Sequence, residues 1–237
     1  MTNVVLFEGA DGSGKSLGIK LLKDILVSKG KRVLVTGALD YELAKTSSLY
    51  DPETMTLGLT NDELCDKTAE SAEEAARYYT SVRNLIAQKI VDLSLTDEYD
   101  YILVDRWTTS SYCYQGDFDF INESNKILHT VNGKVLSLLI HAETDVIVDR
   151  LLKKKEQINQ LDKYELIALE EREKLGYSYN DSVSYTTCFY RDSTLNPNAE
   201  HGVFINSYVE ASEDVCIEMY GKHLYYYVII KFNQSQV

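Results

Sequence analysis

Residues 9–16 read G-A-D-G-S-G-K-S and match the pattern G-x-x-x-x-G-K-[ST] in full. An apolar run, residues 4–7, comes directly before this segment, and leucines and isoleucines recur at helical spacing after it until Gly30. A strand, a glycine-rich turn and a helix in this order form a phosphate-binding loop, because glycines let successive backbone N–H groups face a phosphate. The feature predicts an α/β fold in which a parallel strand leads into a helix.

The loop predicts binding of ATP together with Mg²⁺. Lys15 is placed to reach the β- and γ-phosphates, and the Ser16 hydroxyl is placed for the metal ion. The residues expected to bind ATP are Ala10, Asp11, Gly12, Ser13, Gly14, Lys15, Ser16 and Leu17. The loop alone does not separate a kinase from a GTPase, a motor or a regulatory switch.

The order of the remaining elements predicts a P-loop NTPase fold with a parallel sheet of about five strands flanked by helices. Strands are expected at residues 4–7, 32–36, 101–104, 135–140 and 202–205. Helices are expected at residues 17–29, 61–95, 145–155, 163–175 and 211–220, and residues 225–232, rich in β-forming side chains, could add an edge strand. Residues 1–237 form a single domain in this interpretation, without repeats or linkers.

Charge and composition exclude some partners. A net charge of −13 and an isoelectric point near 4.8 argue against binding to a nucleic acid polymer, which needs a basic surface. No run of 18 apolar residues is present, so we expect no membrane span. The four cysteines lack metal-ligand spacing, and the start of the chain lacks the pattern of a signal peptide. These features predict a cytoplasmic protein with free thiols.

A second group of polar residues follows the third expected strand, where residues 105–116 read D-R-W-T-T-S-S-Y-C-Y-Q-G. The carboxyl end of a parallel strand opens onto the crevice where such sheets bind ligands. Asp105 could hold Mg²⁺ there through water, and Arg106 could hold a phosphate through two N–H groups of its guanidinium. A structural ion pair between these two neighbours is the competing interpretation.

This segment resembles the D-R-[YH]-x-x-S-x-x-A-Y-Q-G signature of thymidylate kinases, with Trp107 at the aromatic position and Cys113 in place of the alanine. Residues 5–16 are similar to that family's E-G-x-[DE]-G-x-G-K-[ST], and residues 79–83 to its F-x-A-x-R helix segment. Further similarity lies in residues 162–165 with Tyr177, which resemble the D-R-x-E…Y stretch after the family's lid, and in residues 204–206 with 212–215, which resemble its last strand and final helix. The resemblance extends, with gaps, to about Tyr220.

The resemblance implies roles for the matching residues. Tyr79 would stack on the base, Arg83 and Gln115 would hydrogen-bond to its edge, and Tyr114 would exclude a 2′-hydroxyl. The implied acceptor-binding residues are Asp11, Tyr79, Arg83, Arg106, Ser110, Tyr114 and Gln115. The implied catalytic residues are Asp11, Lys15, Arg106 and Arg150, and the implied metal site is Ser16 with Asp105. The implied lid spans about residues 150–165, with residues 181–200 as an insertion and a homodimer as the assembly.

Two departures from the family leave part of this open. The family's T-R-E-P-G is replaced by T-G-A-L-D at residues 36–40, so one substrate arginine is missing. The expected lid is longer, and it offers Lys153, Lys154 and Lys155 besides Arg150 as cations, with Lys163 beyond them. The implied reaction is the ATP-dependent phosphorylation of a deoxynucleoside monophosphate, dTMP before others. The alternatives are another deoxynucleoside monophosphate kinase, a deoxynucleoside kinase, and a nucleotide-binding switch without catalysis.

Overall fold

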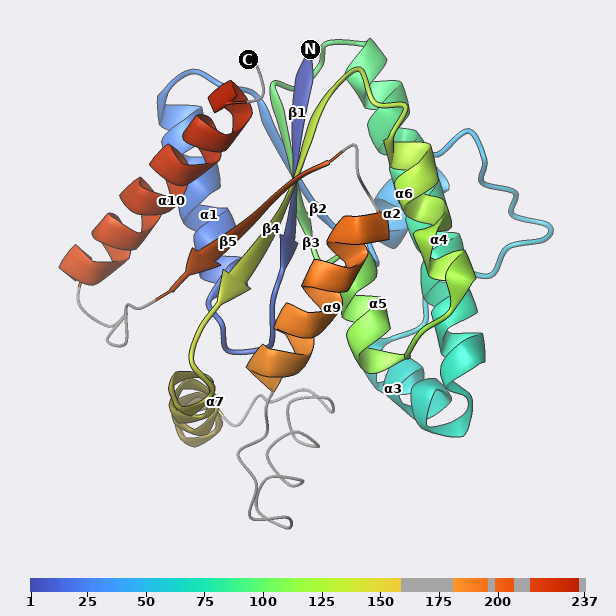
Figure 1. Cartoon of the computed structure of the whole chain (residues 1–237). Coiled ribbons are helices and arrows are strands. Elements are labelled where there is room, and N and C mark those ends of the chain that lie inside the picture. Colours follow the sequence, from blue (N-terminus) through green and yellow to red (C-terminus); the bar gives the residue numbers. More distant parts are fainter. Residues whose placement is uncertain (159–180, 196–198, 207–213, 235–237) are drawn as a thin grey trace.

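A computed structural model describes residues 1–158, 181–195, 199–206 and 214–234. Its core is one five-stranded sheet in the order β2-β3-β1-β4-β5, in which every neighbouring pair is parallel (Figure 1). The strands are β1 (Thr2–Glu8), β2 (Val33–Gly37), β3 (Tyr101–Asp105), β4 (Gly133–His141) and β5 (Glu200–Ile205). The predicted α/β class and the five predicted strands are confirmed.

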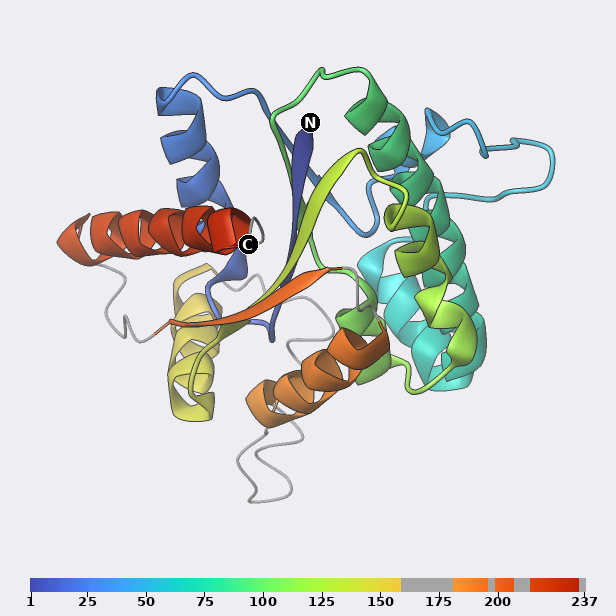
Figure 2. The same cartoon turned by 45° about the horizontal axis from the view of Figure 1, so that its top comes forward.

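Helices cover both faces of the sheet and the carboxyl ends of its strands. They are α1 (Lys15–Ser28), α2 (Tyr41–Lys45), α3 (Asn61–Glu70), α4 (Ala72–Leu95), α5 (Thr108–Tyr114), α6 (Glu123–Leu128), α7 (Thr144–Ile158), α9 (Asp181–Leu195) and α10 (Asp214–Gln234), with a 3₁₀ turn η1 (Asp119–Asn122). In both views α1 and α10 lie on one face and α4 and α6 on the other (Figures 1 and 2). Helices α5, α7 and α9 lie at the end to which the strands of the sheet point.

The central strand β1 is buried on both sides, which explains its continuous apolar sequence. Val4 and Leu6 belong to the core beneath α4, whereas Val5 and Phe7 belong to the core beneath α1 and α10. All four side chains are at most 1% exposed. Alternation along one strand therefore supplies both cores, and the end of β1 is held rigidly where the phosphate loop begins.

The helix predicted for residues 61–95 consists of two helices that meet at Ser71. Thr60 and Glu63 form a reciprocal capping box at the start of α3. Ser71, in an extended conformation, ends α3 and caps α4 by accepting a hydrogen bond from the Glu74 N–H. The sequence pattern is helical on both sides of this break, which is why periodicity alone does not reveal it.

The edge strand suggested for residues 225–232 is wrong, because these residues continue α10. Their tyrosines and isoleucines favour strands locally, but Leu224, Val228 and Phe232 recur every four residues and are all at most 5% exposed. These three side chains pack in the core shared with α1, so tertiary burial of a helical stripe outweighs local propensity. The helix predicted for residues 163–175 lies outside the described residues. Residues 181–195 of the expected insertion form α9, which packs on α5.

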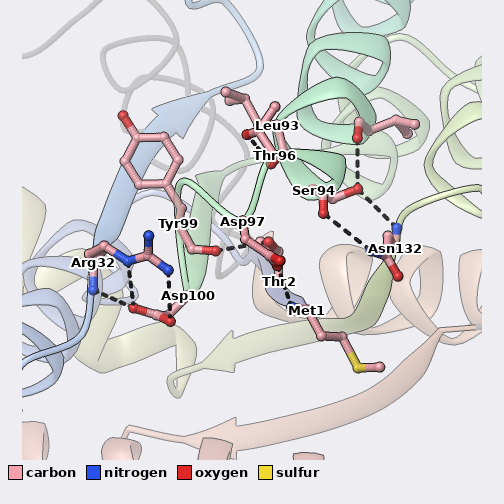
Figure 3. A network of polar contacts seen from close by, with 11 residues as sticks. Met1, Thr2, Arg32, Leu93, Ser94, Thr96, Asp97, Tyr99, Asp100 and Asn132 are labelled. Carbon is pink, nitrogen blue, oxygen red and sulfur yellow. Dashed lines mark hydrogen bonds and ion pairs between the residues drawn. The ribbon is translucent and has the colours of Figure 1, made fainter.

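Polar contacts link the segments that lie at the amino ends of the strands (Figure 3). Arg32, just before β2, donates to the Asp100 carboxylate through its backbone N–H and its guanidinium. The Asn132 N–H donates to the Ser94 hydroxyl at 2.9 Å, and the Thr2 hydroxyl donates to a carbonyl in the turn before β3. This end of the sheet is fastened, and the polar cavities lie at the other end. No helix among the described residues is both long and apolar enough to span a membrane.

Candidate functional site

The phosphate loop joins β1 to α1 and requires glycine at three positions. Gly9, Gly12 and Gly14 have φ values of 142°, 79° and 95°, which side chains with a Cβ rarely adopt. A Cβ on Gly14 would also lie 2.4 Å from the Asn206 side-chain nitrogen. The predicted pattern is therefore present as a tight left-handed turn that leads into the amino end of α1, where backbone N–H groups and the helix dipole favour an anion.

Three distant segments fasten the backbone of this loop. The carbonyls of residues 12–14 accept hydrogen bonds from Arg150 of α7 at 3.0 Å, from Asn206 after β5 at 2.7 Å, and from the Tyr220 hydroxyl of α10 at 3.1 Å. Of the N–H groups in these three peptide groups, that of Ser13 donates to the Ala10 carbonyl at 3.2 Å, and those of Gly14 and Lys15 remain for a ligand. Neither Asn206 nor Tyr220 was predicted as a site residue, although Asn206 stands in the segment 204–206 that resembles the family's last strand.

A cavity of about 250 Å³ lies over the loop. It is lined by Asp11, Gly12, Gly14, Lys15, Ser16, Leu17, Arg150, Leu151 and Lys154. Six of the eight residues predicted to bind ATP are in this lining, whereas Ala10 and Ser13 are buried behind it. Lys15 is only 5% exposed, and burial together with the nearby Arg106 lowers its pKa. We call this space the donor cavity.

Helix α7 brings one face of the expected lid over the donor cavity. Arg150 and Lys154, four residues apart on the same helix face, both line it. Lys153 instead lies at the surface, where it pairs with Asp149 at 2.8 Å. The position of Lys163 falls outside the described residues. The structure thus brings Arg150 and Lys154 to the phosphate loop.

A larger cavity of about 420 Å³ lies beside the loop. Its lining contains all seven residues predicted to bind the acceptor: Asp11, Tyr79, Arg83, Arg106, Ser110, Tyr114 and Gln115. The rest of the lining is Gly37, Ala38, Leu39, Asp40, Asn61, Asp105, Trp107 and Ser111. We call this space the acceptor cavity. Among the residues that the structure describes, Asp11 alone lines both cavities.

Arg106 is held at the junction of the two cavities. Its φ of 66° is in the left-handed region, which is uncommon for a residue other than glycine. Its guanidinium pairs with one carboxylate oxygen of Asp11, and the other oxygen accepts a hydrogen bond from the Tyr114 hydroxyl at 3.0 Å. Although burial raises the pKa of Asp11, the Arg106 and Lys15 cations hold it below its usual value. The competing interpretation, a structural ion pair between Arg106 and its neighbour Asp105, does not hold, because the carboxylate that pairs with Arg106 is that of Asp11.

Arg83 lies in the wall of the acceptor cavity and is only 1% exposed. Its Nη1 donates to the Trp107 carbonyl at 2.9 Å, and its Nη2 lies 3.4 Å from the Thr80 hydroxyl. Its buried Nε has no hydrogen-bond partner within the described part of the chain. A buried donor without a partner is costly, so this atom is suited to a ligand. Burial lowers the pKa of Arg83 to about 10, which leaves it charged near neutral pH.

Asp105 and Ser16 occupy different cavities. Ser16 lines the donor cavity and Asp105 lines the acceptor cavity at the end of β3. The Oδ1 atom of Asp105 is buried and has no hydrogen-bond partner in the described residues. An unsatisfied carboxylate oxygen near the phosphate loop fits a role as a ligand to Mg²⁺, directly or through water.

Two buried carboxylates, those of Glu8 and Asp192, were not predicted to have a role in the site. Glu8, at the end of β1, is 0% exposed and accepts hydrogen bonds from the Trp107 N–H at 2.9 Å and the Ser110 hydroxyl at 2.6 Å. Burial raises its pKa to about 7. A glutamate that ends an apolar strand is a visible signal, whereas nothing in the sequence around Asp192 of α9 marks it as buried.

Comparison with known proteins supports the sequence resemblance. No protein-family model matches the chain. A thymidylate kinase from Prosthecochloris aestuarii is 27% identical over 217 residues, which cover 83% of this chain and 88% of that protein. A thymidylate kinase from Sulfurihydrogenibium sp. is 30% identical over 166 residues, which cover 67% of this chain and 74% of that protein.

The fold has a counterpart among solved structures. The crystal structure of thymidylate kinase from Ehrlichia chaffeensis superimposes with a TM-score of 0.51 over 96% of this chain and 99% of that one, at 16% identity. This similarity shows the fold, whereas the similarity in sequence to the two relatives above shows the family. With its phosphate loop, its second cavity at the D-R segment and these relatives, the chain belongs to the thymidylate kinase family.

Proposed function

We propose that this protein transfers the γ-phosphoryl group of ATP to a deoxynucleoside monophosphate, with dTMP as the acceptor and dTDP as the product. The observation that carries the proposal is the meeting of the two cavities at Asp11, with Lys15 on one side and Arg106 on the other. Two phosphorylated ligands seated in these cavities would bring their phosphates together between these two cations. The relatives named thymidylate kinase support the choice of acceptor.

Catalysis in this proposal is positioning and charge neutralisation. Phosphoryl transfer needs the attacking and leaving oxygens in line and needs its developing negative charge stabilised, without a covalent intermediate. Lys15 neutralises charge on the β- and γ-phosphates, and Arg106 holds the acceptor phosphate. Arg150, whose guanidinium already donates to the Gly12 carbonyl, is placed over the transferred group, with Lys154 on the same helix face.

The acceptor cavity offers suitable groups for a thymine nucleotide. The free Nε of Arg83 is a donor for a base carbonyl, and Gln115 provides both a donor and an acceptor for the neighbouring positions. Tyr79 offers an aromatic face for stacking on the base. Tyr114, fixed by its bond to Asp11, occupies the space beside the sugar and excludes a 2′-hydroxyl.

Mg²⁺ belongs to the same proposal. Ser16 in the donor cavity and the buried, unsatisfied Asp105 carboxylate are the residues that would hold it. When bound, the ion neutralises charge on the phosphates that are being separated.

The wall formed by residues 37–40 carries no cation in this chain. Gly37, Ala38 and Leu39 offer only backbone and apolar groups, and the Asp40 carboxylate accepts bonds from the Leu43 N–H and the Thr36 hydroxyl. Thymidylate kinases, by the resemblance above, place a substrate arginine in this segment. Loss of a contact made equally in the ground and transition states raises KM and leaves kcat unchanged, so we expect a high KM for the acceptor.

The decisive experiment measures ADP release with ATP, Mg²⁺ and each of dTMP, dUMP, dCMP, dGMP, dAMP and thymidine. We expect the highest kcat/KM with dTMP, then dUMP, with the other monophosphates far behind. A preference for thymidine would assign a nucleoside kinase, and preference for dGMP or dCMP would assign another monophosphate kinase. No acceptor-dependent release at all would leave a nucleotide-binding switch and refute the proposal.

We further propose a cytoplasmic homodimer, as the family resemblance and the cysteine chemistry suggest. Within the described part of the chain, Cys65, Cys113 and Cys188 are thiols outside any disulfide, which suits a reducing compartment. Light scattering across a concentration series tests the assembly. A mass that stays at 27.0 kDa at every concentration refutes the dimer.

A further inference from the structure

Asp192 of α9 is a buried carboxylate that belongs to neither cavity lining. It is 5% exposed, and its Oδ2 accepts hydrogen bonds from the Thr108 hydroxyl at 2.7 Å and the Thr109 hydroxyl at 2.8 Å. Its other oxygen, Oδ1, lies 3.3 Å from the side-chain nitrogen of Asn125. A buried carboxylate is costly to leave unsatisfied, so these donors make Asp192 a fixed point in the interior.

The two threonines that donate to Asp192 are the first two residues of α5. That helix has only seven residues and no side-chain cap at its start, and a helix this short does not persist without tertiary contacts. A negative charge at its amino end is favourable for the helix dipole. Asn125 strengthens the same anchor, because it also accepts a hydrogen bond from the Trp107 indole at 2.8 Å. Helix α9 thus holds the first turn of α5 in place.

This turn follows directly on the strained residue of the site. Arg106 has its φ of 66°, and left-handed backbone persists only where the surroundings over-determine it. On one side the Arg106 N–H donates to the Phe7 carbonyl at 2.8 Å, and Glu8 accepts from the next N–H. On the other side of Arg106, the Thr108 and Thr109 hydroxyls donate hydrogen bonds to Asp192. The segment around Arg106, the residue proposed to hold the acceptor phosphate, therefore lies between two buried carboxylates, Glu8 of β1 and Asp192 of α9.

We propose that Asp192 is a positioning residue for the acceptor site and acts through Thr108 and Thr109. Fixing the first turn of α5 fixes Ser110 and Tyr114 on that helix and the backbone of Arg106 before it. The inference rests on the proposed function, because it concerns the geometry of the acceptor phosphate. It assigns a role in that reaction to α9, whose described side chains line neither cavity.

Asp192→Ala tests this by steady-state kinetics, with dTMP and ATP varied separately. Without the Asp192 carboxylate we expect Arg106 to be misaligned. Displacements of about 1 Å at a reacting group lower the reaction rate by on the order of 10²-fold. We expect the KM for dTMP to rise about tenfold and kcat to fall about tenfold, while the KM for ATP stays within about twofold. Ser193→Ala is the matched control, since Ser193 is the next residue on α9 and bonds only locally to the Tyr190 carbonyl in the contacts described. It is expected to behave as wild type.

A double-mutant cycle separates positioning from a general loss of stability. If Asp192 acts through the two threonines, Thr108→Val with Thr109→Val loses as much kcat/KM for dTMP as Asp192→Ala, and the triple variant loses no more. Should Asp192→Ala fail to fold, the Asp192→Asn and Thr109→Val variants carry the same comparison, with circular dichroism to verify folding. The inference would be overturned if Asp192→Ala raised the KM for ATP by the same factor as the KM for dTMP. It would also be overturned if the losses in kcat/KM for dTMP from the Asp192 and threonine substitutions were additive in the triple variant. A wild-type protein without dTMP-dependent ADP release would overturn the proposed function and this inference with it, whereas an active wild type with an unchanged Asp192 variant would overturn the inference alone.

Discussion

Replacing Glu8 with Gln removes a titrating group from the most buried part of the site. Glu8 Oε1 accepts from the Trp107 N–H, and its Oε2 lies 2.6 Å from the Ser110 hydroxyl. A glutamine can reproduce this pattern, because its carbonyl accepts from the N–H and its amide donates to the hydroxyl. Glu8→Gln therefore resembles the protonated form of the wild-type side chain and should fold in the same way.

The magnitude follows from the pKa of Glu8, which burial raises from 4.5 to about 7. A raised pKa means that the folded state keeps its proton in a pH range where the unfolded state has released it. The stability of wild type consequently falls with increasing pH between these values, by about 1.4 kcal/mol per pH unit, and then levels off. Over the whole window this amounts to about 3 kcal/mol, which is absent in Glu8→Gln.

Urea denaturation of both proteins from about pH 5.5 to about pH 8.5 measures the difference. The range starts above the isoelectric point near 4.8, where solubility is poor. Within it we expect the stability of wild type to fall by about 2 kcal/mol relative to Glu8→Gln, which is a midpoint shift of about 0.7 M at an m value of about 3 kcal/mol/M. Other groups titrate in both proteins and cancel in the difference. A difference that stays constant with pH, or that grows toward low pH, would refute the assignment of Glu8 as a carboxyl with a raised pKa.

Three further substitutions test the cavities. Lys15→Met should lower kcat by at least about 10³-fold without lowering the melting temperature, because it removes phosphate neutralisation and a buried cation; near-wild-type turnover would contradict this. Tyr114→Ala should reduce the preference for dTMP over its 2′-hydroxyl analogue, expected in wild type to be at least about 10²-fold in kcat/KM, by about tenfold; an unchanged preference would show that another group reads the sugar. Gly14→Ala should weaken ATP binding by more than about tenfold in calorimetry, because its Cβ would meet Asn206 at 2.4 Å. Gly30→Ala, with φ 75° but nothing within 4 Å, is the control for backbone strain alone and should bind ATP normally.

Much of the fold was predictable because its signals are local. The apolar strands, the glycines of the phosphate loop and the order of strands and helices each depend on a few neighbouring residues. The exception, residues 225–232 of α10, shows the limit of this reasoning. There a locally β-forming composition is outweighed by the burial of Leu224, Val228 and Phe232 against α1, a helix that begins at Lys15 near the other end of the chain.

Site residues that stand in a sequence motif were predictable. Site residues that depend on contacts between distant parts of the chain were not. All seven predicted acceptor residues line one cavity, and all of them stand in three recognisable segments, residues 5–16, 79–83 and 105–116. Their roles in binding stay predictions. The roles of Asn206, Tyr220 and Asp192 were not predicted, since each side chain contacts a backbone or side-chain group more than 80 positions away in the sequence. A lone polar residue in a helix pattern gives no sign of such a partner.

The ion pair between Asp11 and Arg106 has a consequence for which ligands the protein accepts. In this pair Arg106 already binds an anion, so a ligand that binds Arg106 must first displace the Asp11 carboxylate. A singly charged anion exchanges one charge for another and gains little from doing so. A phosphate monoester carries close to two charges and three acceptor oxygens, so it can satisfy Arg106 and still engage Lys15. If Arg106 binds the acceptor phosphate as proposed, Asp11 would therefore favour phosphate monoesters over chloride and carboxylates at this arginine.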